Sequence, residues 1–176
     1  MRIIAGSAKG RKISRPKTAD TRPMMDSTRE AIFNILGPID GLRIADLYAG
    51  SGALSLEALS RGAAMAVAVE NDKSVAEVIR QNAEGLGFGP NLRLEVKTVG
   101  EWLGHNTEQF DIIFFLPPYA AFDAKILSYV PERLSPNGLL IIALSRRQDP
   151  GRIDGLKQLS QRKYGQSVVS FYQKKG

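Results

Sequence analysis

Five short apolar runs alternate with helical segments from residue 42 onward, and this alternation constrains the fold more than any other feature of the chain. The runs cover residues 42–47, 65–69, 92–96, 111–116 and 139–144. Between the first three runs, apolar residues recur at helical spacing, namely Leu54, Ala58 and Leu59, then Val75, Val78, Ile79, Ala83 and Leu86. Strands that alternate with helices of this kind form crossover units. The sequence therefore predicts an α/β fold with a mostly parallel sheet and helices on both faces.

Both ends of the chain predict additions to this sheet. Residues 157–164 and 167–173 flank Gly165 and predict a closing antiparallel hairpin. Ile3 and Ile4, followed by turn glycines, predict an N-terminal β-hairpin. Ser27 and Glu30 form a capping-box pattern, which predicts a helix that ends near residue 37. We divide the chain into an N-terminal extension, residues 1–40, and a domain that contains the sheet, residues 41–176.

The composition excludes several classes of protein. The 176 residues include no cysteine and one histidine, so we expect no disulfide, no cysteine nucleophile and no metal site. The chain has no run of about 18 apolar residues and no secretory signal at its start, so we expect no membrane contact. We expect a cytoplasmic protein that acts as a monomer.

The positive charge is concentrated at the N-terminus. The whole chain carries 24 Lys and Arg against 18 Asp and Glu, a net charge of +6. Residues 1–22 hold seven of the basic residues and one acid, so the remainder has 17 of each sign and is neutral. A basic segment on a neutral body is typical of contact with a polyanion, although a solvated tail has the same composition. We expect contacts with nucleic-acid phosphates from Arg2, Lys9, Arg11, Lys12, Arg15 and Arg22, and such contacts do not distinguish RNA from DNA.

A glycine-rich loop follows the first strand. The segment from Asp46 runs through Leu47, Tyr48, Ala49, Gly50, Ser51 and Gly52 into a helix. Glycines let the backbone approach a ligand closely, and the start of the following helix favours negative groups. Glu70 ends the second strand 20 residues after Gly50, a spacing at which an acid binds ribose hydroxyls. Together these residues predict a nucleotide-type cofactor site, whereas the glycines alone predict only a tight turn.

Two cofactors compete for this loop. A dinucleotide site requires a third glycine, but Ser55 occupies that position. A carboxylate such as Asp46 suits the amino-acid end of S-adenosylmethionine better than a pyrophosphate. We therefore favour S-adenosylmethionine and keep a nicotinamide-dependent oxidoreductase as the weaker alternative.

The fourth strand leads into Leu116, Pro117, Pro118 and Tyr119. Consecutive prolines cannot continue a central strand, so the chain must leave the sheet beside the cofactor crevice. The loop, Glu70, this turn and the N-terminal segment together resemble the bacterial 16S ribosomal RNA guanine-N2 methyltransferases of the RsmD type. The resemblance covers essentially the whole chain, including Arg29 and the segment that follows it.

This resemblance implies a class I methyltransferase fold with a seven-stranded, Rossmann-like sheet and an added N-terminal hairpin and helix. It implies that the glycine loop and Asp46 hold S-adenosylmethionine, with Glu70 on the ribose. Asn71 or Asp72 would lie near the adenine, together with Thr98 and Val99. It also implies that residues 1–40 contact RNA and that residues 41–176 form the methyltransferase domain, and we place Arg29 with the RNA-contacting residues. The implied partner is 16S ribosomal RNA in an assembling small subunit.

Leu116 departs from the family pattern, which has Asp or Asn before Pro-Pro-Tyr. An oxygen at this position and the Pro117 carbonyl would accept the two hydrogens of the guanine amine, while Tyr119 stacks on the flipped base. Leucine accepts no hydrogen bond, which costs about 1.5 to 3 kcal/mol, or about one to two decades of rate. We therefore expect catalysis to be impaired, and a non-catalytic RNA-binding protein is the second functional hypothesis.

Overall fold

The computed structural model describes residues 1–17 and 24–176, and its centre is a seven-stranded sheet with the order β3-β2-β1-β4-β5-β7-β6. The first five strands pair in parallel: β1 (Arg43–Leu47), β2 (Met65–Val69), β3 (Leu92–Glu95), β4 (Phe110–Phe115) and β5 (Leu134–Ser145). The last two, β6 (Leu156–Tyr164) and β7 (Ser167–Lys174), form the predicted antiparallel hairpin. The predicted α/β fold and sheet are confirmed.

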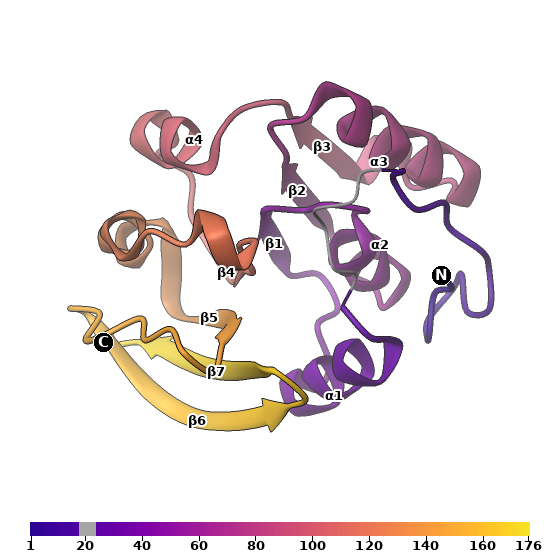
Figure 1. Ribbon diagram of the computed structural model, residues 1–176. Helices are drawn as coiled ribbons and strands as arrows, with labels where there is room; N and C mark the ends of the chain where they lie inside the picture. Colours follow the sequence, from indigo (N-terminus) through magenta and orange to yellow (C-terminus); the bar gives the residue numbers. More distant parts are fainter. Residues whose placement is uncertain (18–23) are drawn as a thin grey trace.

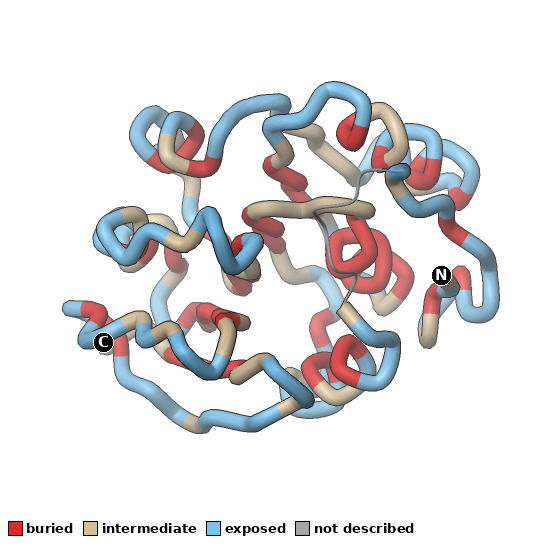
Figure 2. The backbone as a smooth tube through the Cα atoms, in the orientation of Figure 1, coloured by how far each residue is buried: buried red, intermediate tan, exposed pale blue. Residues whose placement is uncertain are grey.

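Helices cover both faces of the sheet (Figure 1). One face carries α1 (Asp26–Leu36), α2 (Ala53–Ser60) and α3 (Lys73–Leu86), and the N-terminal residues pack outside α2. The other face carries α4 (Val99–His105) and the short 3-10 turns between β4 and β5. The central strands are buried on both sides and β6 is largely exposed (Figure 2). This burial explains why the central strands are continuous apolar runs in the sequence.

Two strand boundaries differ from the prediction. β5 begins at Leu134, five residues before its apolar run, because Leu134 already pairs with Phe110 of β4, and a register shift separates this pair from the pair of Leu139 and Ile112. Asn137 adopts a φ of 61° within this irregular stretch. β4 ends at Phe115, one residue before Leu116, as expected for a strand that is followed by prolines.

The predicted capping box at the start of α1 is wrong. The helix begins at Asp26, and Met25 at the N-cap position provides no side-chain hydrogen bond. Asp26 lies in the first turn, where a negative charge is favourable, and its carboxylate pairs with Arg29 at 3.2 Å. The helix ends at Gly37 (φ 72°), as predicted.

The predicted N-terminal hairpin is reduced to one antiparallel bridge, between Arg2 and Lys12, within described residues 1–17. The N–H groups of Ile3, Gly10 and Ile13 still donate across the hairpin, to the carbonyl oxygens of Arg11, Ile3 and Met1. The ladder extends no further because the N–H groups of the intervening residues bind α2. The N–H groups of Ile4 and Ala5 donate to the carboxylate of Glu57 at 2.9 and 3.0 Å. The N–H groups of Ser7 and Ala8 donate to the Ser60 carbonyl and hydroxyl oxygens at 2.7 and 2.9 Å. We call residues 1–17 the N-terminal arm.

The arm is part of the hydrophobic core. Ile3, Ala8 and Ile13 are buried in a cluster with Leu56 of α2 and Ala83 of α3. This packing holds the arm against the same two helices that frame the glycine loop. The division of the chain at residue 40 stays a prediction about function.

Gly6 allows the arm to approach α2 closely. Its φ is +82°, and a Cβ at this position would lie 1.8 Å from the Ser60 carbonyl oxygen. Gly10 has the same conformation, φ +81°, but a Cβ there would have no neighbour within 4 Å. Of these two glycines, Gly6 alone therefore combines a left-handed backbone with a close neighbour that leaves no room for a side chain.

We expect Gly6→Ala to destabilise the protein more than Gly10→Ala. Both substitutions place alanine in the left-handed region, at a cost of about 1 to 2 kcal/mol. Gly6→Ala adds the collision with Ser60, and overpacking of this kind costs about 1 to 3 kcal/mol more. Urea unfolding of the two variants measures the difference. Equal losses of stability would show that the arm does not pack on α2 in solution.

Candidate functional site

The predicted site residues gather at one edge of the sheet. Because β3, β2, β1 and β4 are adjacent and parallel, their carboxyl ends lie side by side. Four loops therefore meet there: the loop before α4, the loop before α3, the glycine loop before α2, and the Pro-Pro-Tyr turn. This edge is the usual ligand site of open α/β sheets.

The glycine loop is a tight, left-handed turn. Tyr48, Gly50 and Gly52 have φ values of 66°, 54° and 74°. A Cβ on Gly52 would lie 3.0 Å from the Ile79 side chain, so α3 packs directly against the loop. A Cβ on Gly50 would have only the Tyr48 carbonyl oxygen near it, at 3.9 Å. Gly52 therefore packs against α3, whereas the space next to Gly50 is open.

Glu70 connects the glycine loop to the next loop. One oxygen of its carboxylate accepts a hydrogen bond from the N–H of Gly50 at 3.0 Å, and the other accepts from the N–H of Asp72 at 2.9 Å. Gly50 and Glu70, which the sequence assigns to the same cofactor site, are therefore in direct contact. Each oxygen retains further acceptor capacity, so the carboxylate can also bind ligand hydroxyls.

Asp46 lies beneath the loop. Its side chain is 1% exposed, and its Oδ2 accepts from both the N–H and the hydroxyl of Ser55, at 3.1 and 2.7 Å. Burial raises the pKa of Asp46 from 3.8 to about 6, against the opposing effect of the Ser55 hydrogen bonds. In the sequence, Ser55 stands only where a dinucleotide site requires glycine, and its hydrogen bonds to Asp46 were not predicted. The Asp46-x8-Ser55 spacing across a strand and the start of a helix was the available signal.

Two other predicted cofactor residues serve as helix caps. Asp72 Oδ1 accepts from the N–H groups of Ser74 and Val75 at the start of α3, at 2.7 and 3.2 Å. Thr98 forms a capping box with Glu101 at the start of α4. The Thr98 hydroxyl donates to the Glu101 carboxylate and accepts from the Glu101 N–H, which leaves one acceptor lone pair. Asn71 is exposed beside Asp72, whereas the side chain of Val99 is buried in the core.

The Pro-Pro-Tyr turn is anchored to the end of the sheet. Leu116 is half-buried against the core on the α1 face, and Tyr119 is 39% exposed. The hydroxyls of Tyr119 and Ser167 are hydrogen-bonded at 2.6 Å, and the side-chain amide of Gln148 donates to the Tyr119 carbonyl oxygen at 2.6 Å. Pro117 is buried and Pro118 is exposed. Ser167 and Gln148 were not predicted as partners of the turn, because they lie about 30 to 50 residues from it in the sequence.

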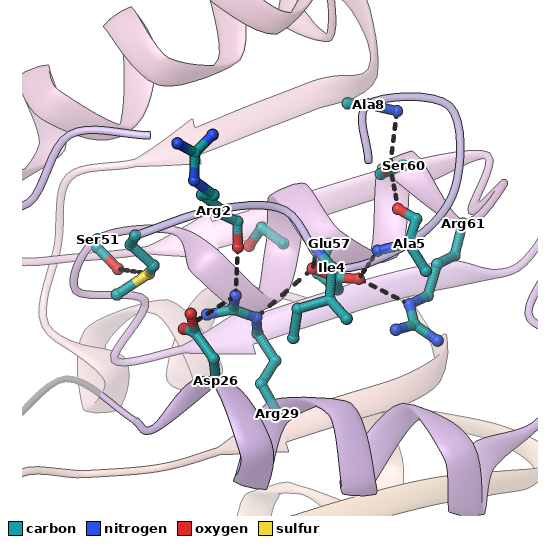
Figure 3. A network of polar contacts seen from close by, with 12 residues as sticks. Arg2, Ile4, Ala5, Ala8, Asp26, Arg29, Ser51, Glu57, Ser60 and Arg61 are labelled. Atoms are coloured by element: carbon teal, nitrogen blue, oxygen red, sulfur yellow. Dashed lines mark hydrogen bonds and ion pairs between the residues drawn. The ribbon is translucent and has the colours of Figure 1, made fainter. Parts of the chain in front are cut away.

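The structure separates the predicted RNA-contacting residues into two groups. The predicted RNA-contacting residues within the arm are exposed, namely Arg2, Lys9, Arg11, Lys12 and Arg15. Arg22 lies outside the described residues. The prediction for Arg29 is wrong, because its side chain is fully buried. Its Nη2 donates to the Arg2 carbonyl oxygen at 2.5 Å, and its Nε lies 3.5 Å from a Glu57 carboxylate oxygen (Figure 3).

The described residues, 1–17 and 24–176, contain no group of three or more His, Cys, Asp or Glu side chains that could hold a metal ion. None of the helices in these ranges has both the length and the apolar character that crossing a membrane requires.

Comparison with known proteins identifies the class of fold. The structure is similar to "Putative methyltransferase yhhF from Escherichia coli", with a TM-score of 0.90, 30% identity and coverage of 99% of this chain and 97% of that one. The fold is therefore that of the class I methyltransferases, as predicted. A glycine loop at the carboxyl edge and the strand order agree with this class.

The sequence defines the family. Residues 1–173 match the family described as conserved hypothetical protein 95, and the chain belongs to this family. It is 32% identical to "Putative rRNA methyltransferase YlbH" of Bacillus subtilis over the whole of both chains. It is 39% identical to ribosomal RNA small subunit methyltransferase D of Escherichia coli K12, over 80% of this chain and 69% of that one. These relatives confirm the predicted family.

We expect Asp46→Asn to remove a pH-dependent destabilisation. A carboxyl whose pKa is raised to about 6 on folding makes the protein less stable as pH rises from about 4 to 6, because the folded state binds the proton more tightly. The burial cost is then fully present above pH 6 and amounts to about 3 kcal/mol. Urea unfolding between pH 4 and 8 measures the difference in stability between variant and parent. A difference that does not change with pH would contradict the raised pKa.

Proposed function

We propose that this protein transfers a methyl group from S-adenosylmethionine to the exocyclic N2 amine of a guanine in 16S ribosomal RNA. The observation that carries the proposal is the juxtaposition at the sheet edge. The glycine loop, joined to Glu70, ends β1, and the anchored Tyr119 turn ends the adjacent strand β4. A methyl donor and a flipped base would therefore lie over neighbouring strands.

The loop residues fit S-adenosylmethionine. The open space above Gly50 admits a ligand next to the backbone, and Gly52 is held by α3. Glu70 would accept hydrogen bonds from the ribose hydroxyls while it keeps its contact with Gly50. Thr98 would use its remaining lone pair to accept from the adenine amine. S-adenosylmethionine supplies an electrophilic methyl group on its sulfonium.

Asp46 requires a different role from the one predicted. Ser55 occupies one of its oxygens and the side chain is almost fully buried, so we propose that Asp46 fixes the loop from below. Asp72 would likewise shape the adenine side of the site through its cap on α3, with Asn71 exposed beside it.

At the acceptor side, Tyr119 would stack on the flipped guanine, and the Pro117 carbonyl would accept one hydrogen of its amine. This would orient the amine lone pair toward the methyl group. Leu116 cannot accept the second hydrogen. The exposed basic residues of the arm would bind RNA phosphates, and the substrate would be naked RNA or an assembling small subunit.

A second function, RNA binding without methyl transfer, is favoured by one observation. Leu116 is packed against the core on the α1 face, as an ordinary apolar strand residue would be. This candidate and the enzyme share the cofactor and RNA sites, and only turnover distinguishes them.

We expect Glu70→Ala to weaken the binding of S-adenosylmethionine by about one to two decades, the loss that follows removal of hydrogen bonds to a charged acceptor. Glu77→Ala is the matched control, because Glu77 contacts Arg80 and Gln81 on the exposed side of α3. Isothermal titration calorimetry measures both affinities. Unchanged affinity in Glu70→Ala would place the cofactor away from this loop.

We expect Leu116→Asp to transfer methyl about 10 to 100 times faster than the parent chain, because it restores a charged acceptor for the amine. The assay follows labelled methyl from S-adenosylmethionine into small-subunit particles that lack the modification. Leu116→Ala is the control for loss of the leucine side chain alone. Equal rates for all three proteins would mean that the Pro117 carbonyl and Tyr119 suffice, and absence of transfer by all three would favour the non-catalytic function.

A further inference from the structure

A shallow groove of about 380 Å³ lies beside the Pro-Pro-Tyr turn, between the end of β5 and the β6–β7 hairpin. Its floor includes the apolar residues Ile142, Leu144 and Val168 and the polar residue Ser170. Its walls include two cations, Arg146 and Lys163, and one acid, Asp149. We call this feature the hairpin groove.

The two groove cations are available to a ligand. Arg146 and Lys163 are both exposed, and neither forms an ion pair with another residue of the described ranges. Asp149 accepts a hydrogen bond from the N–H of Gly151 at 2.8 Å. Arg147, which is also exposed, follows Arg146 in the turn after β5 and adds a further positive charge to this end of the groove.

The groove is continuous with the proposed base-binding turn. Gln148 lines the groove, and its side-chain amide donates to the Tyr119 carbonyl oxygen at 2.6 Å. Ser167, which binds the Tyr119 hydroxyl, precedes Val168 of the groove floor. A nucleotide stacked on Tyr119 would therefore have its neighbours in the chain at the mouth of the groove.

The groove and the arm lie on opposite faces of the sheet. The arm packs on α2 and α3, whereas the groove floor belongs to the core on the α4 face. Figure 1 shows the N-terminal segment and the β6–β7 hairpin on different sides of the molecule. If the arm alone bound the RNA, it would hold the RNA from one side of the sheet edge. The position of the RNA strand next to Tyr119 would then have no contact of its own.

We infer that the hairpin groove is a second RNA-binding surface, in which Arg146 and Lys163 bind phosphates of the strand next to the flipped guanine. This inference rests on the proposed function, because RNA is the polyanion that the Tyr119 turn would present to the groove. Phosphate contacts position a nucleic acid without reading its sequence, and the groove would therefore set the register of the RNA at Tyr119.

The test is the double variant Arg146→Gln and Lys163→Gln, with Lys157→Gln and Arg162→Gln as the matched control. The control removes the same charge from exposed positions of β6 that pair with Gln173 and Val169. Val169 belongs to the core on the α1 face, and side chains alternate along a strand, so Arg162 points away from the groove. Glutamine keeps both sites polar, and thermal unfolding verifies that the variants are folded.

Equilibrium binding of a 16S ribosomal RNA transcript is measured over a series of salt concentrations. We expect the groove variant to bind about tenfold more weakly at low salt and to lower the slope of log affinity against log salt by about 1.4, which corresponds to two phosphates on a single strand. The control should keep the slope of the parent. In the methyl-transfer assay the groove variant should raise KM and leave kcat unchanged, as expected for uniform binding.

Three outcomes would overturn the inference. Equal slopes for groove variant, control and parent would show that the groove does not contact RNA, and the proposed function would stand if the parent still binds RNA and transfers methyl. Weaker binding only to protein-containing particles would mean that the groove contacts protein. A parent chain that neither binds RNA nor transfers methyl would refute the proposed function, and the inference with it.

Discussion

The buried carboxylate of Glu57 is the interaction on which the arrangement of the N-terminal half depends (Figure 3). It is fully buried on α2, accepts from the N–H groups of Ile4 and Ala5, and pairs with Arg61 at 2.8 Å and with Arg29 at 3.5 Å. The arm, α1 and α2 thus meet at one side chain. A buried charge without its partners costs about 3 to 5 kcal/mol, so these three segments must assemble together.

The contacts of Glu57 also affect the carboxyl edge of the sheet, because α2 begins at the glycine loop. The first turn of the helix is fixed by Ser55 on Asp46, and its second half is fixed by Glu57 and Ser60 on the arm. The same eight-residue helix therefore determines where the loop and the arm lie relative to one another. Apolar packing alone would not fix this relation, since it is non-directional.

The sheet was predictable from the sequence, whereas the burial and the hydrogen-bond partners of individual polar residues were not. The observed bounds of β2 are those of its apolar run, because the pattern of apolar residues along a buried strand is local in the sequence. Arg29 could not be identified as buried, since the buried acid with which it pairs, Glu57, lies 28 positions away on α2. Thr98 and Asp72 were correctly placed at the sheet edge, but their caps depend on helix starts that the pattern fixes only within a few residues. The spacing of Gly50 and Glu70 placed both at one edge of the sheet, because parallel neighbouring strands end there, but the hydrogen bond between them was not predicted.

At the end of β4, the residue proposed to stack on the base, Tyr119, and the position of the missing acceptor, Leu116, have different contacts. Tyr119 is held through its hydroxyl by Ser167 and through its carbonyl by Gln148, and neither contact involves residue 116. Leu116 meanwhile packs against the α1-face core, so the strand does not require an oxygen at that position. Stacking depends on the ring, whereas orientation of the amine depends on the acceptors beside it. If the proposed function holds, affinity for RNA and rate of methyl transfer would therefore depend on different side chains of one turn, and loss of the acceptor at residue 116 would lower the rate more than the affinity.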